Sequence, residues 1–215
     1  MKSLLLACVA WSCLSLSAQA HEIWIERDNG SGPVRVYFGE PAEKAADPAE
    51  DELGRLKHFE LIGTQGKAGP ATRQGDHLVA PLKSSGDAWL FDNQVFEPWQ
   101  GEDKRYEAVS YYARAGRENT VGRQVLELVP TQKNGDTLTV VFRDKPLAEA
   151  EVALIDSNKQ QQTLKSDTQG QVTLPKLAAG RYIVVVSHQE PVQKQIAGKS
   201  VAVMHHISTL TFAEE

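Results

Sequence analysis

Three histidines of this chain could bind a transition-metal ion, and His21 has the most unusual chemistry of them. It follows Ala18-Gln19-Ala20, an A-x-A pattern typical of signal-peptide cleavage sites. Cleavage after Ala20 would make His21 the first residue of the mature protein. Its α-amine and its own Nδ1 could then chelate one ion, which no internal histidine can do. An α-amino pKa of about 7.7–8.0 lets the amine lose its proton to a metal near neutral pH.

One further imidazole would complete a T-shaped set of three nitrogens, the histidine brace. Such a set favours copper(II) and is also acceptable to nickel(II). We predict His188 and His206 as the partners of His21. His188 follows the apolar segment Tyr182–Ser187 and shares strand parity with Val184, and His206 shares parity with Leu210, so it should face the core. A solvated terminal histidine and a histidine capping a strand are the alternative interpretations.

The first twenty residues predict export. Lys2 precedes the apolar segment Leu4–Trp11. This segment is too short to span a bilayer, because a transmembrane helix needs about 20 consecutive apolar residues. We therefore expect a signal peptide over residues 1–20 and a periplasmic mature protein without direct membrane insertion. Both cysteines, Cys8 and Cys13, lie in that signal, so a metal would have to be bound through nitrogen and oxygen.

The charge balance makes nucleic acid an unexpected partner. The chain has 23 basic and 28 acidic residues, for a formal net charge of −5. A mildly acidic protein is not attracted to nucleic acid or to an anionic membrane surface. The acidic run Asp47–Glu52 lacks the spacing of a calcium-binding loop, and we interpret it as solvated.

Alternating apolar residues predict a mainly β protein in two β-rich units, residues 21–124 and 125–215. In the first unit, Asn29-Gly30 lies between two strand-like segments and predicts a hairpin. Further strands are expected at His58–Gly63, His77–Pro81 and Ala88–Asn93. One short helix is expected over Glu102–Ala115, because Tyr106, Val109 and Ala113 have helical spacing.

The second unit should be an immunoglobulin-like antiparallel sandwich. About seven short segments with strand-like alternation are separated by turn signals, a spacing typical of that fold. They are Gln124–Pro130, Thr137–Phe142, Glu151–Asp156, Gln162–Ser166, Gln171–Leu174, Gly180–Ser187 and Ser200–Phe212.

Several short motifs of the chain resemble a family of exported bacterial proteins described as a domain of unknown function. The motifs are His21–Glu26, Val34–Glu40, Leu126–Pro130, Lys145–Ala148, Asp167–Val172, Val186–His188 and Ser208–Phe212. That family was formerly labelled the periplasmic component of a nickel/cobalt ABC transport system. The resemblance implies a β-rich periplasmic protein that handles transition metals, with histidines at positions 21 and 188. His205 and His206 depart from the family pattern.

These observations lead us to expect a non-enzymatic periplasmic protein that binds copper(II), nickel(II) or cobalt(II) for uptake or buffering. A membrane metal transporter is the expected partner. Two alternatives remain open: a copper redox enzyme that uses the same histidine brace, and a metal-free envelope module that binds another protein. Reductant-dependent oxygen or peroxide turnover would indicate the enzyme, and the absence of retained metal would indicate the module.

Overall fold

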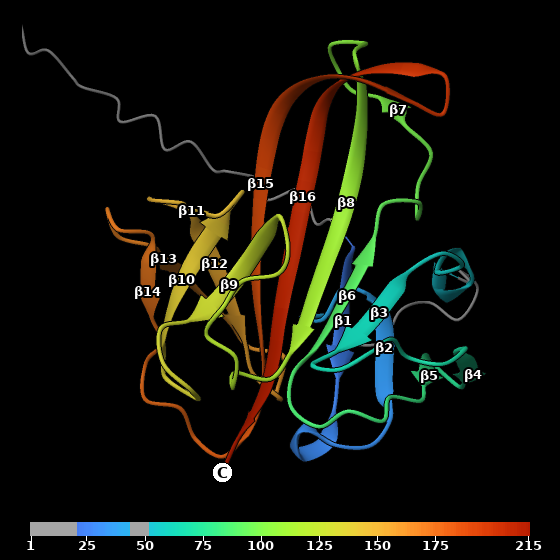
Figure 1. Cartoon of the computed structure of the whole chain (residues 1–215). Helices are drawn as coiled ribbons and strands as arrows, with labels where there is room; N and C mark the ends of the chain where they lie inside the picture. The colour runs from blue at the N-terminus through green and yellow to red at the C-terminus, as the bar shows by residue number, and fades with distance from the viewer. Residues whose placement is uncertain (1–20, 44–51) are drawn as a thin grey trace, which may run out of the picture.

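The computed structural model describes residues 21–43 and 52–215 and consists almost entirely of β-strands (Figure 1). The predicted signal peptide and most of the acidic run lie outside these residues. An eight-stranded sheet forms the centre of the molecule, with the order β13-β12-β15-β16-β8-β6-β3 and with β7 paired to β8. Its strands are β3 (Glu60–Gly63), β6 (Ala88–Asp92), β7 (Trp99–Gln100), β8 (Tyr106–Ala115), β12 (Glu151–Ile155), β13 (Gln161–Lys165), β15 (Gly180–Ile196) and β16 (Lys199–Glu214).

Two four-stranded sheets cover the opposite faces of the central sheet. One contains β1 (Glu22–Glu26), β2 (Val34–Gly39), β4 (Thr72–Gln74) and β5 (His77–Ala80); the other contains β9 (Leu126–Pro130), β10 (Thr137–Phe142), β11 (Lys145–Pro146) and β14 (Gln171–Thr173). Two short 3-10 turns, η1 (Asp28–Gly30) and η2 (Glu52–Arg55), complete the elements. The mainly β, sandwich-like fold expected from the sequence is therefore confirmed.

Alternation along the central strands produces a separate hydrophobic core on each face. In β15, Ile183 and Val185 join the core beneath the β1–β2 sheet, whereas Val184 and Val186 join the core beneath the β9–β10 sheet. Because both faces are covered, the strand is a continuous apolar run. The same rule places Tyr111 and Tyr112 of β8 in opposite cores.

The helix predicted over Glu102–Ala115 is wrong, because this segment contains strand β8. β8 pairs in parallel with β16 and antiparallel with β6. Every residue from 108 to 115 is buried, so the strand shows no alternation between apolar and polar residues, and the spacing of its apolar residues matched a helix by coincidence. β-Branched and aromatic residues such as Val109 and Tyr111 favour a strand.

The two predicted units share this central sheet. β16 lies between β15 and β8, so strands from both sides of residue 124 are hydrogen-bonded to one another. The predicted hairpin at Asn29-Gly30 is confirmed by the antiparallel pairing of β1 with β2.

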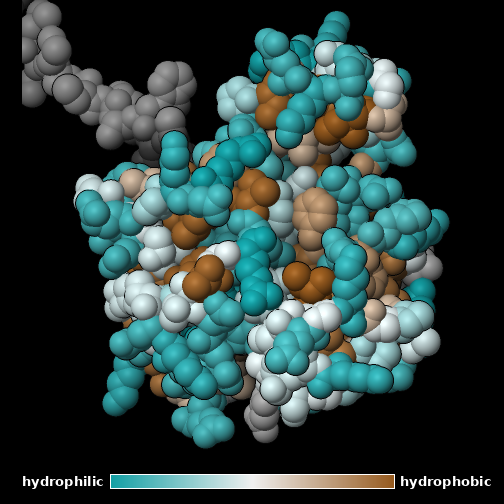
Figure 2. Space-filling view, in the orientation of Figure 1, coloured by the Kyte–Doolittle hydropathy of each residue, from teal (hydrophilic) through white to brown (hydrophobic). Residues whose placement is uncertain are grey.

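β15, β16 and the start of β8 extend beyond the rest of the sheet as an arm in which β8 pairs in parallel with β16 (Figure 1). We predicted that the strand would end at His188, but β15 continues to Ile196. A register shift between Pro191 and Lys194 accommodates the proline, since a bulge tolerates a residue without an N–H. Met204 and Val201 form a small core within the arm, and Figure 2 shows hydrophobic patches among hydrophilic side chains there.

Candidate metal centre

His21 lies at the start of β1, where its side chain is fixed by two neighbours. Its Nε2 is 2.5 Å from Oε2 of Glu52, and its ring lies 5.5 Å from the ring of Phe38. Glu52 begins the turn η2, which packs against β2. We interpreted Glu52 as part of a solvated run, and the structure corrects this: the carboxylate orients the His21 imidazole.

Further carboxylates surround this end of β1. Glu22 is paired with Gly39 in the hairpin register, which places it beside Glu40. Burial, together with the charge of Glu40, raises the pKa of Glu22 to about 8. Burial and the neighbouring Glu43 also raise the pKa of Glu40, while the charge of His21 opposes this rise. The Glu22 carboxyl, which holds its proton near neutral pH, can release it to a bound cation.

Tyr111 and Asp92 face one another across the β6–β8 pair beside this cluster. Burial and the charges of Glu22, Glu52 and Asp92 raise the pKa of the Tyr111 phenol. Asp92 is only 2% exposed; its Oδ1 accepts a hydrogen bond from the Gln94 amide, and its Oδ2 has no partner. Burial raises its pKa.

A polar pocket of about 780 Å³ opens next to Glu52. His58 lines it, and the charge of His58 partly offsets the effect of burial on the pKa of Asp92. Glu52, which contacts the His21 imidazole, is also part of the pocket wall. It is lined by Glu52, Gly54, Arg55, Lys57, His58, Gln94, Val95, Phe96 and Glu97.

The structure brings His188 and His206 together but separates both from His21. The two residues are direct cross-strand neighbours in the β15–β16 pair, and their rings lie 4.4 Å and 5.1 Å from the ring of Phe142. Phe142 packs against the core beneath the β9–β10 sheet. His21 precedes Ile23, which belongs to the core on the other face, so the central sheet lies between His21 and the pair.

His206 faces the core, as its parity predicted, and is 4% exposed. Its Nδ1 lies 3.1 Å from the Tyr112 hydroxyl and its Nε2 lies 3.3 Å from Oε2 of Glu190. Arg143 donates two hydrogen bonds to the same Glu190 carboxylate. Burial lowers the pKa of His206. Both ring nitrogens therefore have protein partners, which is typical of a structural histidine.

The remaining histidines contact carboxylates elsewhere on the surface. His77 Nδ1 lies 2.8 Å from Asp76, and His205 Nε2 lies 2.6 Å from Glu107. Among residues 21–43 and 52–215, no three His, Cys, Asp or Glu side chains are grouped closely enough to hold a metal ion. The side chains of these described residues do not form a complete metal site by themselves. A metal site at His21 therefore requires the main-chain amine of His21 as well.

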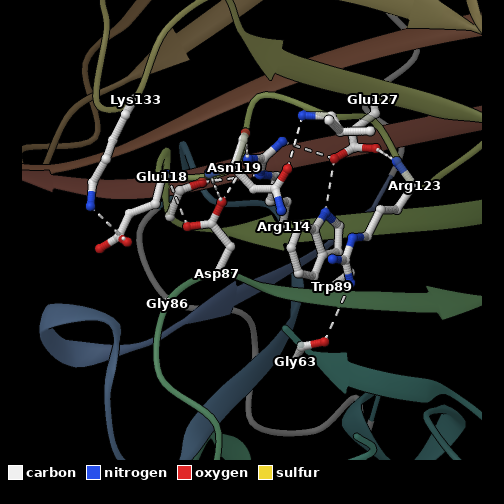
Figure 3. A network of polar contacts seen from close by, with 12 residues as sticks. Gly63, Gly86, Asp87, Trp89, Arg114, Glu118, Asn119, Arg123, Glu127 and Lys133 are labelled. Carbon is white, nitrogen blue, oxygen red and sulfur yellow. Dashed lines mark hydrogen bonds and ion pairs between the residues drawn. The ribbon is translucent and has the colours of Figure 1, made fainter. Parts of the chain in front are cut away.

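A separate buried network fixes the loop between β8 and β9 (Figure 3). Arg114 donates to Asp87 at 2.6 Å and to Glu127 at 3.0 Å, and Glu127 also accepts from the Trp89 indole at 2.9 Å. The second oxygen of Glu127 accepts the amides of Arg123 and Gln124. These contacts satisfy each charge locally and indicate a structural role.

Sequence reasoning identified His21 and the inward-facing His206 but did not identify Glu22, Glu40, Glu52 or Asp92. A signal for Glu22 was present, because it is adjacent to His21 and the hairpin register pairs it with Gly39, next to Glu40. No sequence signal indicated that η2 would fold back onto His21.

Comparison with known proteins gives a family for the chain. No curated protein matches it. Within the described residues, no helix is long and apolar enough to cross a membrane. The model of the family described as Domain of unknown function (DUF4198) matches residues 18–190, which is most of the chain and includes both His21 and His188. The chain therefore belongs to the DUF4198 family.

Proposed function

We propose that this protein is exported and binds a transition-metal ion in the cell envelope through His21 as its mature N-terminal residue. Its role would be the uptake or buffering of this ion. This role agrees with the nickel/cobalt transport label formerly given to the family that the sequence resembles. The ion is cargo that the protein binds and releases, and the proposal needs no catalytic step.

The observation that carries this proposal is the contact between His21 Nε2 and Glu52. A carboxylate beside Nε2 favours the tautomer with the proton on that nitrogen. Nδ1 is then left as the unprotonated nitrogen, and Nδ1 is the atom that can close a six-membered chelate with the residue's own α-amine. Metal-bound histidines commonly donate their other ring N–H to a carboxylate in this way.

The neighbouring carboxylates support the proposal through charge and donor type. His188 and His206 lie across the sheet, so oxygen donors from Glu22 or Glu40 replace the second imidazole of the expected brace. Two nitrogens with one or two oxygens suit copper(II) best among divalent first-row ions, with nickel(II) and cobalt(II) following. A bound dication would also relieve the repulsion between Glu22 and Glu40.

The test compares the mature protein that begins at His21 with the same protein whose His21 α-amine is acetylated. Calorimetric titration with copper(II) and nickel(II) measures affinity, and electron paramagnetic resonance reports the nitrogen ligands of copper(II). We expect acetylation to weaken copper(II) binding by at least about 100-fold, because it removes the chelating amine. Equal affinity in the two proteins would refute the proposal.

Substitutions then separate the proposed ligand shell from the rest of the molecule. Glu52→Gln should weaken binding by about 10–100-fold, the usual effect of losing a carboxylate behind a metal-bound histidine. His77→Gln is the matched control, because it removes another carboxylate-paired histidine and should leave the affinity unchanged. His188→Gln should also leave it unchanged; a large loss there would restore the ligand set predicted from sequence.

A further inference from the structure

A second pocket, of about 280 Å³, lies on the face of the central sheet opposite His21. It opens between strands β3, β6 and β8 and the segment Arg123–Val125 that leads into β9. Its volume is just below the usual range for small-molecule sites, about 300–1,000 Å³. Its apolar lining consists of Ile62, Trp89, Leu90, Phe91, Tyr112 and Val125.

Aromatic side chains line one side of this pocket. The rings of Phe91 and Tyr112 are stacked, with centroids 5.4 Å apart and an interplanar angle of 28°. Tyr112 is itself fixed from behind, because its hydroxyl contacts His206. A rigid aromatic wall suits a planar apolar ligand, since offset stacking is favourable and little side-chain entropy is lost.

Arg123 supplies a positive charge at the mouth of the pocket. Its guanidinium lies 4.2 Å from the centre of the Trp89 ring and donates one long hydrogen bond, 3.5 Å, to the Gly63 carbonyl (Figure 3). In residues 21–43 and 52–215 its side chain forms no ion pair with a carboxylate. Glu60, the acidic residue in the lining, is paired with Lys67. Most of the guanidinium's donors therefore remain available to an anion.

Gln124 supplies an acceptor that lacks a donor. Its Nε2 donates to the Leu90 carbonyl at 2.7 Å, while its Oε1 is buried and has no hydrogen-bond partner. The contact with Leu90 fixes the amide orientation, because the flipped form would place two oxygens against each other. A buried acceptor without a donor is costly, and a ligand hydroxyl or N–H would satisfy it.

We propose that this pocket binds a small aromatic carboxylate that carries a hydrogen-bond donor on its ring. The ring lies against Phe91 and Tyr112, the carboxylate pairs with Arg123, and the donor reaches Oε1 of Gln124. This site is independent of the proposed metal centre, because the central sheet separates the two.

The test is a calorimetric titration of the protein with para-hydroxybenzoate, in the presence of a chelator so that metal binding does not contribute. Two related probes separate the contacts. Benzoate lacks the hydroxyl that would reach Gln124, and para-hydroxybenzamide lacks the negative charge that would pair with Arg123. We expect each to bind at least about tenfold more weakly than para-hydroxybenzoate.

Protein variants complete the experiment. Arg123→Gln should weaken para-hydroxybenzoate binding at least about tenfold while the protein stays folded. Arg105→Gln is the matched control, because Arg105 is exposed, pairs with Asp103 and lies in the loop between β7 and β8. No saturable binding up to about 1 mM, equal affinity for the three probes, or an unchanged affinity in Arg123→Gln would overturn the proposal.

Discussion

Glu127→Gln hardly changes the shape of the side chain, yet it should lower the unfolding free energy strongly. Glu127 is fully buried, and each of its oxygens accepts two hydrogen bonds. Oε1 receives the Trp89 indole and Arg114, and Oε2 receives the Arg123 and Gln124 amides. Whichever way a glutamine amide turns, its NH₂ group faces two donors.

The magnitude follows from the groups left without an acceptor. Each buried donor that loses its partner costs about 1–3 kcal/mol. Arg114 also keeps only Asp87 as a counter-charge, and breaking one side of a buried ion pair typically costs about 3–5 kcal/mol. We therefore expect a loss of about 3–5 kcal/mol in unfolding free energy, which corresponds to a melting temperature lower by roughly 6–20 °C for a chain of this size.

Urea denaturation followed by far-ultraviolet circular dichroism measures this loss. Glu118→Gln is the control, because Glu118 lies in the same loop, is exposed, and pairs at 3.2 Å with Lys133 of the loop between β9 and β10. It should change stability by less than about 1 kcal/mol. If Glu127→Gln were no more destabilising than Glu118→Gln, the network would not anchor the loop, and this reasoning would be refuted.

Three further predictions test other parts of the structure. Glu22→Gln should become more stable than the parent as pH rises from about 5 to 8, because the folded-state pKa of Glu22 is raised to about 8 from 4.5. The stability that Glu22 contributes is therefore present at low pH and is lost as pH rises through that interval. Chemical denaturation at several pH values measures the unfolding free energy of both proteins, and parallel pH profiles would contradict the prediction. Gly170→Ala should destabilise by more than about 1 kcal/mol, because φ is +73° and the added Cβ would lie 2.8 Å from Pro146; thermal unfolding is the assay, and an unchanged midpoint would be the contrary result. Thr209→Val should cost about 1 kcal/mol, since it removes a 2.8 Å hydrogen bond to the Ile23 carbonyl, and amide hydrogen exchange should show faster opening of β1 but not of β10.

Local alternation predicted most strands but could not predict how they are assembled. The hairpin of β1 and β2 and the inward orientation of His206 follow from turn chemistry and parity, which are properties of neighbouring residues. β8 was mistaken for a helix because burial on both faces leaves a strand without alternation. Its parallel pairing with β16 joins residues about a hundred positions apart, and no local pattern encodes such a contact.

The candidate site divides in the same way. The chemistry of His21 could be predicted from a cleavage pattern and one residue type. The partner Glu52 could not, because it reaches His21 only when η2 packs on β2. His188 and His206 could be predicted to share a face, but the face to which β1 packs depends on long-range contacts such as Thr209 with Ile23.

The position of β16 between β15 and β8 also determines when this protein can fold. Residues 199–214 form the central strand β16. The strand β8 is synthesised much earlier, and one of its edges has no partner until β16 becomes available. Non-local pairing of this kind delays folding. The central sheet, and with it the surface that supports His21, can therefore close only after residues 199–214 have been synthesised.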